Sequence, residues 1–287
     1  SGHTTMRVLI LGSKRLCLRM TERFVAIDRA SVAAVITFDD SGDTRSELRA
    51  LLDLTPRFGI PVHVARDRRH AESLIAAARV DLCVVLNWYW LLGTECLASA
   101  PRGFLGVHMS ALPRYRGTSP VVWQLINGEP EVGFSVFTLA ENMDSGDLWA
   151  QGAVPVGADD QVAAVLARLE SAVAATFDTL YPALLNETAR AYPQPNVTPT
   201  YCAARLPDDG AIDFTQSARR CHDFVRAQSR PYPGAFTIHE GDRLVIWRAQ
   251  ALEMTYFGRP GQVARVADDG VTVICGDNHP LLLETVG

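Results

Sequence analysis

Two side chains that could exchange a proton follow apolar, strand-like segments of the sequence. His108 ends the apolar run 104–108, and Asp144 follows the run 133–139. An imidazole oriented by a carboxylate is a common arrangement for moving protons and stabilising charge in a reacting group. The residue types alone are equally compatible with a structural histidine and a turn aspartate. The pair predicts proton-transfer chemistry if both side chains face one crevice.

The N-terminal half of the chain alternates short, β-branched apolar runs with helix-periodic segments. Such alternation builds a mostly parallel sheet with helices on both faces, and ligands bind beyond the carboxyl ends of its strands. Gly12 follows the first run without a Gly-x-Gly-x-x-Gly pattern, so a dinucleotide-binding loop is not expected. The expected strands are 8–11, 33–38, 82–86, 104–108 and 133–139, and the expected helices are 16–27, 46–58, 71–78, 120–127 and 161–185.

A proline-rich segment separates this Rossmann-like region from a C-terminal part of different character. Residues 192–199 are typical of an extended linker. After one helical segment, 215–228, five short β-like runs follow at a spacing that predicts a small β-barrel of the OB type. We therefore expect a catalytic domain over residues 6–190, a linker over 191–206 and an OB-like domain over 207–287.

Composition and charge exclude several classes of function. Hydrophobic residues make up 48% of the 287 residues and charged residues 21%, as in an ordinary globular protein. A formal net charge of −5 and a single lysine, Lys14, offer no basic surface for a nucleic acid. No apolar run approaches the ~20 residues that span a bilayer, so a cytoplasmic protein without a membrane partner is expected. The six scattered cysteines are expected to be reduced core residues rather than metal ligands.

The segment around His108 resembles the signature of the folate-dependent formyltransferases. The similarity is carried by residues 103–117 and by Asp144-Ser145-Gly146-Asp147. It extends to Gly59-Ile60-Pro61-Val62 and to C-terminal segments such as 230–235, which look like those of the tRNA and amino-sugar enzymes. The resemblance implies direct transfer of a formyl group from 10-formyltetrahydrofolate to the amine of a small metabolite, with no covalent enzyme intermediate.

The resemblance also implies roles for the pair. In that family an Asn, a His and an Asp form the catalytic set, and His108 and Asp144 match the last two. His108 would donate to the developing oxyanion and shuttle protons, while Asp144 would keep it charged and help to hold an ordered water. This sequence departs from the pattern at Gly106, where the family has the Asn. An oxyanion donor is worth roughly 3 kcal/mol, so its loss could cost about a hundredfold in rate.

Three explanations are compatible with Gly106. Asn87 ends the neighbouring strand, and adjacent strands lie about 4.8 Å apart, so its amide is hypothesised to reach the space beside Gly106 and act in catalysis. The acceptor could instead be a nucleophile, such as a hydroxylamine, that needs less electrophilic help. The chain could finally have diverged to other one-carbon chemistry, to hydrolysis of formyl-folate or to folate binding without turnover.

The folate is expected to lie against two segments that, in the family, hold the flat pterin largely through backbone groups. The aromatic residues here also suit stacking on a heterocycle, although Trp88 and Trp90 could simply be domain core. The expected folate residues are Trp88, Tyr89, Trp90, Leu91, Leu92, Ala140, Glu141, Asn142 and Met143. The loop after His108 is expected to contact the substrate through Ser110, Arg114, Arg116 and Gly117.

Two classes of small acceptor remain, because an acidic chain with one lysine lacks the basic surface that a tRNA acceptor would need. N-hydroxyornithine, formylated in siderophore biosynthesis, supplies a hydroxylamine and is slightly favoured. A nucleotide-linked amino sugar is the alternative, and arginines could hold its pyrophosphate. No metal is expected, and a homodimer is left open.

Overall fold

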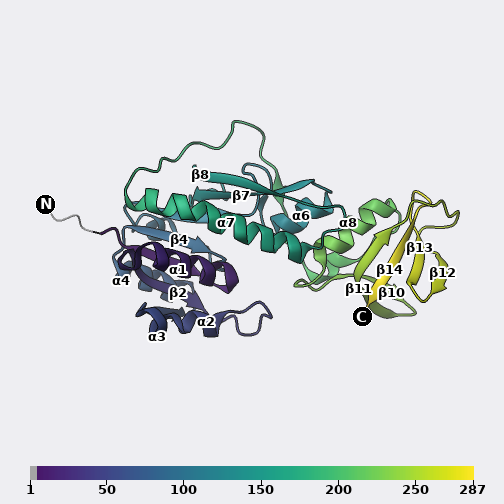
Figure 1. Ribbon diagram of the computed structural model, residues 1–287, viewed down its shortest axis with the longest axis horizontal. Helices are drawn as coiled ribbons and strands as arrows, with labels where there is room; N and C mark the ends of the chain where they lie inside the picture. Colours follow the sequence, from purple (N-terminus) through teal and green to yellow (C-terminus); the bar gives the residue numbers. More distant parts are fainter. Residues whose placement is uncertain (1–4) are drawn as a thin grey trace. The chain divides into compact units, whose positions relative to one another are not determined.

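The computed structural model describes residues 5–287 of the chain (Figure 1). The chain divides into two compact units, each built from three stretches of sequence. The first unit contains residues up to 114, 133–152 and 170–199, and the second contains residues 115–132, 153–169 and 200–287. The domain boundaries expected at residues 190 and 207 stay a prediction.

A seven-stranded sheet forms the centre of the first unit. Its strand order is β3-β2-β1-β4-β5-β7-β8; the first five of these strands run parallel, and β7 is antiparallel to β5. All residues of β1 and β4 are buried, which explains why these strands are apolar throughout rather than alternating. The strands are β1 Val8–Gly12, β2 Val32–Phe38, β3 Val62–Ala65, β4 Leu82–Leu86, β5 Phe104–His108, β7 Glu131–Thr138 and β8 Leu148–Pro155.

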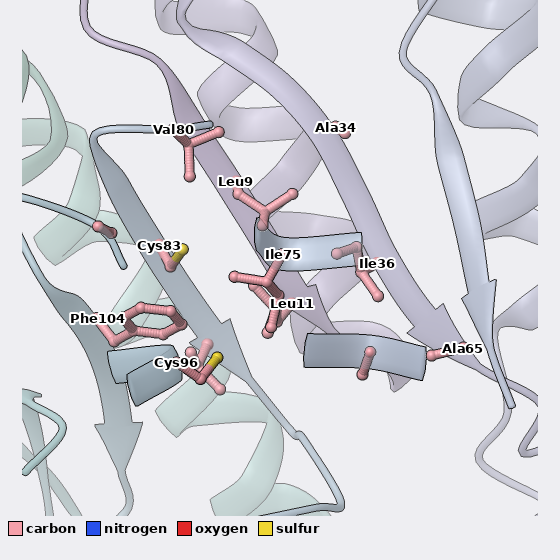
Figure 2. Close-up of a cluster of buried hydrophobic side chains, with 13 residues drawn as sticks. Leu9, Leu11, Ala34, Ile36, Ala65, Ile75, Val80, Cys83, Cys96 and Phe104 are labelled. Carbon is pink, nitrogen blue, oxygen red and sulfur yellow. The ribbon is translucent and has the colours of Figure 1, made fainter. Parts of the chain in front are cut away.

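One face of this sheet packs against helices α4 (Arg68–Ala78) and α5 (Thr94–Leu97). Figure 2 shows Leu9 and Leu11 of β1 beside Ile75 of α4, with Cys83 on the adjacent strand β4 and Phe104 on β5, the next strand along. These side chains are at most 2% exposed. Burial of one such side chain stabilises the fold by about 1.5–3 kcal/mol relative to leaving it in water.

Helix α1 (Lys14–Asp28) belongs to the other helical layer, together with the C-terminal part of α7 (Val162–Leu185). Phe24 of α1 stacks on Tyr181 with ring centroids 4.0 Å apart and meets the edge of Phe177 at 5.2 Å. The expected fold class, a mostly parallel sheet with helices on both faces, is confirmed.

The helix expected over residues 46–58 is instead two short helices, α2 (Leu48–Leu52) and α3 (Leu54–Phe58). Pro56 explains the break. Its nitrogen has no hydrogen to donate to the carbonyl of Leu52, and its ring would clash with that carbonyl in a continuous helix. Leu52 is therefore the last residue of α2, and α3 begins where Pro56 falls in a first turn.

The second unit contains a five-stranded antiparallel sheet, coloured green to yellow in Figure 1, with α8 (Ala218–Gln228) packed on it. The expected C-terminal β domain is confirmed in this form, and its finer assignment as OB-like stays a prediction. Helix α6 (Pro120–Ile126) and the short paired strands β6 (Arg116–Gly117) and β9 (Tyr201–Cys202) also belong to this unit. The sheet strands are β10 Ala235–His239, β11 Asp242–Ala251, β12 Val263–Ala267, β13 Gly270–Ile274 and β14 Pro280–Val286.

All six cysteines are free thiols, and five of them are buried. Burial raises the pKa of Cys17 to about 12, so this thiol is uncharged and unreactive near neutral pH. Cys202 is half-buried. Within residues 5–287, no helix combines the length and apolarity that crossing a bilayer would require.

Candidate active site

The structure brings His108 and Asp144 together in the first unit. His108 is the last residue of β5, and Asp144 lies in the loop between β7 and β8. The Nδ1 atom of His108 is 3.7 Å from Oδ2 of Asp144. This distance is too long for a hydrogen bond but short enough for a strong charge interaction when the imidazole is protonated. His108 is only 8% exposed, so water screens the pair weakly.

The antiparallel register of β5 and β7 explains how residues far apart in sequence meet. His108 lies opposite Ser135, and Gly106 lies opposite Phe137. After β7 the chain turns back, and the amide of Thr138 donates to the carbonyl of Asp147 at 2.8 Å. This turn brings the intervening Asp144 back toward the end of β5.

Gly146 allows the turn to pass close to the sheet. A Cβ on this residue would overlap the carbonyl oxygen of Thr138. The loop that carries Asp144 can therefore keep its path only if residue 146 has no side chain. We expect Gly146→Ala to lower the free energy of unfolding by about 1–3 kcal/mol, the usual cost of overpacking, and to lower turnover as well.

Urea unfolding and steady-state kinetics would check this expectation. Gly42→Ala is the matched control, because a Cβ on Gly42 would meet no atom within 4 Å. If Gly146→Ala were as stable and as active as Gly42→Ala, the loop would be free to relax and Asp144 would not depend on this close approach.

The space beside Gly106 is filled by apolar side chains. A Cβ on Gly106 would lie 2.8 Å from Cδ2 of Leu139 and 3.2 Å from Cε1 of Phe137. The atoms nearest to that position thus come from β7 and the residue after it, and not from Asn87. The hypothesis that the Asn87 amide reaches the space beside Gly106 finds no support among these nearest atoms. A catalytic role for Asn87 stays a prediction.

Asn87 instead lines a cavity of about 850 Å³ in the first unit. It follows β4 in the left-handed region, with φ of 55°, and its carbonyl accepts a hydrogen bond from the Ser13 hydroxyl at 2.7 Å. The cavity lies at the carboxyl ends of several parallel strands, and its lining includes Lys14 after β1 and Asp40 after β2. This is the edge at which parallel sheets bind ligands.

One wall of the cavity is aromatic. Phe38, Trp88 and Trp90 meet edge to face, with ring centroids 5.5–5.6 Å apart. The indole Nε1 of Trp88 is buried and finds no hydrogen-bond partner within the described part of the chain. A buried donor without a partner costs about 1–3 kcal/mol, which a ligand acceptor would recover.

Other residues of the cavity lining are charged. The Nζ atom of Lys14 lies 3.6 Å from Asp40 and 3.8 Å from Asp43, and Arg45 and Arg66 also line the space. The remaining expected folate residues lie outside this lining. Leu91 is exposed, Leu92 is partly buried, and Ala140, Glu141, Asn142 and Met143 form an exposed stretch.

The residues expected to bind substrate fall into two groups. Ser110 is fully buried, and its hydroxyl donates to the carbonyl of Arg114 at 2.6 Å, so it shapes the loop after His108. Arg114 is exposed. Arg116 and Gly117 belong to the second unit, where they form β6 beside β9. Contact of any of these residues with a substrate stays a prediction.

Comparisons with known proteins identify the family of the chain. A family model for formyl transferase matches residues 8–178, and one for the formyl transferase C-terminal domain matches residues 206–287. Among solved structures, the sugar 3N-formyltransferase WlaRD, in the presence of dTDP and 5-N-formyl-THF, is 14% identical with a TM-score of 0.73. The match covers 99% of this chain and 98% of that one.

Two further structures are similar. The N-formyltransferase of Helicobacter canadensis, in complex with folinic acid and dTDP-3-aminofucose, is 16% identical with a TM-score of 0.77, over 97% of this chain and 99% of that chain. HypX from Aquifex aeolicus is 18% identical with a TM-score of 0.65, over 97% of this chain but only 45% of that one. At such identities the structures show a shared fold, whereas the family models cover most of the sequence. The chain therefore belongs to the formyl transferase family, as its sequence predicts.

Proposed function

We propose that this enzyme transfers the formyl group of 10-formyltetrahydrofolate to the amine of a nucleotide-linked amino sugar. The observation that carries the proposal is the approach of His108 to Asp144 at the carboxyl end of β5. The similarity to two sugar enzymes over nearly the full length of both chains supports the acceptor class. Both were studied with a formyl-folate, which supports the donor.

His108 and Asp144 can assist both steps of a direct transfer, the attack on the formyl carbon and the release of the folate nitrogen. The amine nitrogen attacks the formyl carbon, a new carbon–nitrogen bond forms and the formyl oxygen becomes an oxyanion. A protonated His108 donates to that oxygen, and Asp144 stabilises the imidazolium. The oxyanion then reforms its carbonyl, the bond to the folate nitrogen breaks, and that nitrogen takes up one proton while the acceptor amine gives one up. A buried imidazole can relay this proton.

The folate is proposed to bind in the cavity beside the aromatic wall. Its volume of about 850 Å³ lies within the roughly 300–1,000 Å³ typical of small-molecule sites. Flat rings stack favourably on Trp88 and Trp90, and the indole Nε1 of Trp88 could donate to a heteroatom of the ligand.

Trp88→Phe tests this placement, because it removes the N–H group and keeps an aromatic ring. We expect a Kd for 5-formyltetrahydrofolate about three- to tenfold higher, the usual worth of one hydrogen bond, in titration calorimetry. Trp149→Phe is the matched control, since the indole of Trp149 already donates to the Thr138 hydroxyl at 2.9 Å. An equal Kd for Trp88→Phe and the unmodified protein would count against this cavity as the folate site.

A second acceptor is favoured by a different observation. The three atoms nearest to a Cβ at Gly106 belong to the apolar Leu139 and Phe137, and none of them is a hydrogen-bond donor. A hydroxylamine such as that of N-hydroxyornithine is a stronger nucleophile than an ordinary amine and needs less electrophilic help. The formyl transfer chemistry is the same for both acceptors.

Product analysis by mass spectrometry separates the candidates. The purified protein is incubated with 10-formyltetrahydrofolate and either dTDP-3-aminofucose or N-hydroxyornithine. Formylation of the sugar nucleotide supports the proposal, and formylation of N-hydroxyornithine alone overturns the sugar acceptor. Release of formate without any formylated product would identify a hydrolase instead.

A further inference from the structure

The proline-rich segment contains a side chain that reaches the loop of Asp144. The Nε2 atom of Gln194 donates to the backbone carbonyl of Asp144 at 2.7 Å and to that of Gly146 at 2.9 Å. One amide group thus holds two carbonyls of the loop, although Gln194 lies 50 and 48 residues away from them in sequence. The composition of this segment predicts only a linker.

The backbone around Gln194 is held in place from both sides. Its neighbours, Pro193 and Pro195, have fixed φ angles, and a residue before proline is restricted to extended conformations. Tyr192 forms an antiparallel bridge with Leu148 at the start of β8, with hydrogen bonds of 2.7 and 2.9 Å in the two directions. The backbone that carries the Gln194 side chain is therefore restrained by the bridge to β8 and by the two prolines.

The loop that accepts these hydrogen bonds contains an unfavourable backbone conformation. Asp144 adopts a φ of 51°, a left-handed conformation that is uncommon for a residue with a side chain. Within the loop, the amide and hydroxyl of Ser145 donate to the carbonyl of Asn142 at 3.3 and 2.9 Å. The Gln194 bonds attach to the residues on either side of Ser145, including the one whose carboxylate approaches His108.

We propose that Gln194 is a positioning residue, which fixes the Asp144 carboxylate against His108 by holding the backbone on both sides of Ser145. This inference rests on the proposed function of the His108–Asp144 pair. A displacement of about 1 Å in a catalytic group can cost up to about a hundredfold in rate. Loss of the Gln194 bonds should therefore lower the chemical step and leave substrate binding intact.

Gln194→Met tests the inference, because methionine has a similar volume and no N–H group. We expect kcat to fall between about tenfold and a hundredfold, as for other residues that support a catalytic side chain, with the KM of both substrates unchanged. Asn196→Leu is the matched control: it replaces another amide of the same segment with an apolar side chain, and Asn196 is exposed. The assay uses 10-formyltetrahydrofolate with dTDP-3-aminofucose and with N-hydroxyornithine, and thermal unfolding monitors the fold.

The same substitution in an Asp144→Asn background shows which residue Gln194 acts through. If it acts through the Asp144 carboxylate, Gln194→Met causes no further loss in that background. An equal loss in both backgrounds, or a wild-type kcat for Gln194→Met alone, overturns the inference while the proposed function stands. If the single variants His108→Ala and Asp144→Asn each kept full turnover, the proposed function itself would be overturned.

Discussion

Replacing His108 with alanine is expected to lower kcat about a thousandfold. The imidazole serves two roles in the proposed reaction, as donor to the oxyanion and as relay for a proton, and each is commonly worth about a hundredfold or more. His108 is the only group that the proposed mechanism assigns to both roles. Steady-state kinetics with 10-formyltetrahydrofolate, together with a folate-binding titration, would show a loss in the chemical step and an unchanged Kd.

His63→Ala is the control for this experiment, because His63 is exposed on β3 and has no part in the proposed reaction. His108→Asn guards against a loss caused by an empty space, since asparagine fills part of the buried site. If either His108 variant retained turnover within about tenfold of the unmodified enzyme, acid–base catalysis by this residue would be ruled out.

The second large effect is expected from restoring an amide beside His108. Gly106→Asn combined with Leu139→Ala should raise kcat for an amino-sugar acceptor about a hundredfold, because the new amide can donate to the oxyanion. Gly106→Asn alone should lower stability and activity, since its Cβ would lie 2.8 Å from the Leu139 side chain. The gain therefore requires both changes.

Leu139→Ala alone is the matched control for the double variant, because it opens the space without adding a donor. Its expected effect is a modest loss of stability and no gain in rate. Kinetics and thermal unfolding of all three variants would check the prediction. A double variant no faster than Leu139→Ala would mean that residue 106 does not face the developing charge.

The sequence predicts that His108 and Asp144 lie close together because each residue follows a strongly apolar strand. The run that ends in His108 is observed as β5 with the same bounds, and Asp144 falls in the loop after β7. Strands that are buried on both faces, such as β5 and β7, are apolar along most of their length, and the resemblance to the family supplies the rest of the prediction.

The sequence pattern does not predict strand β8, and the reason is physical. Gly152 lies in its middle and weakens the β pattern, although a glycine is needed there because the ring of Phe134 packs against its backbone. The position of Leu139 beside Gly106 is also not predictable from the sequence. The pairing of β5 with β7 decides which side chain fills the space beside Gly106, and composition carries no information on register.

The aromatic wall also places tryptophan fluorescence at the cavity. Trp88 and Trp90 are two of its five tryptophans, and both line the cavity proposed for the folate. A pterin that stacked on these indoles would quench their emission, whereas Trp149, with its N–H bonded inside the protein, would remain as an internal reference. Occupancy of the cavity can thus be followed by intrinsic fluorescence, without a label and before any acceptor has been identified.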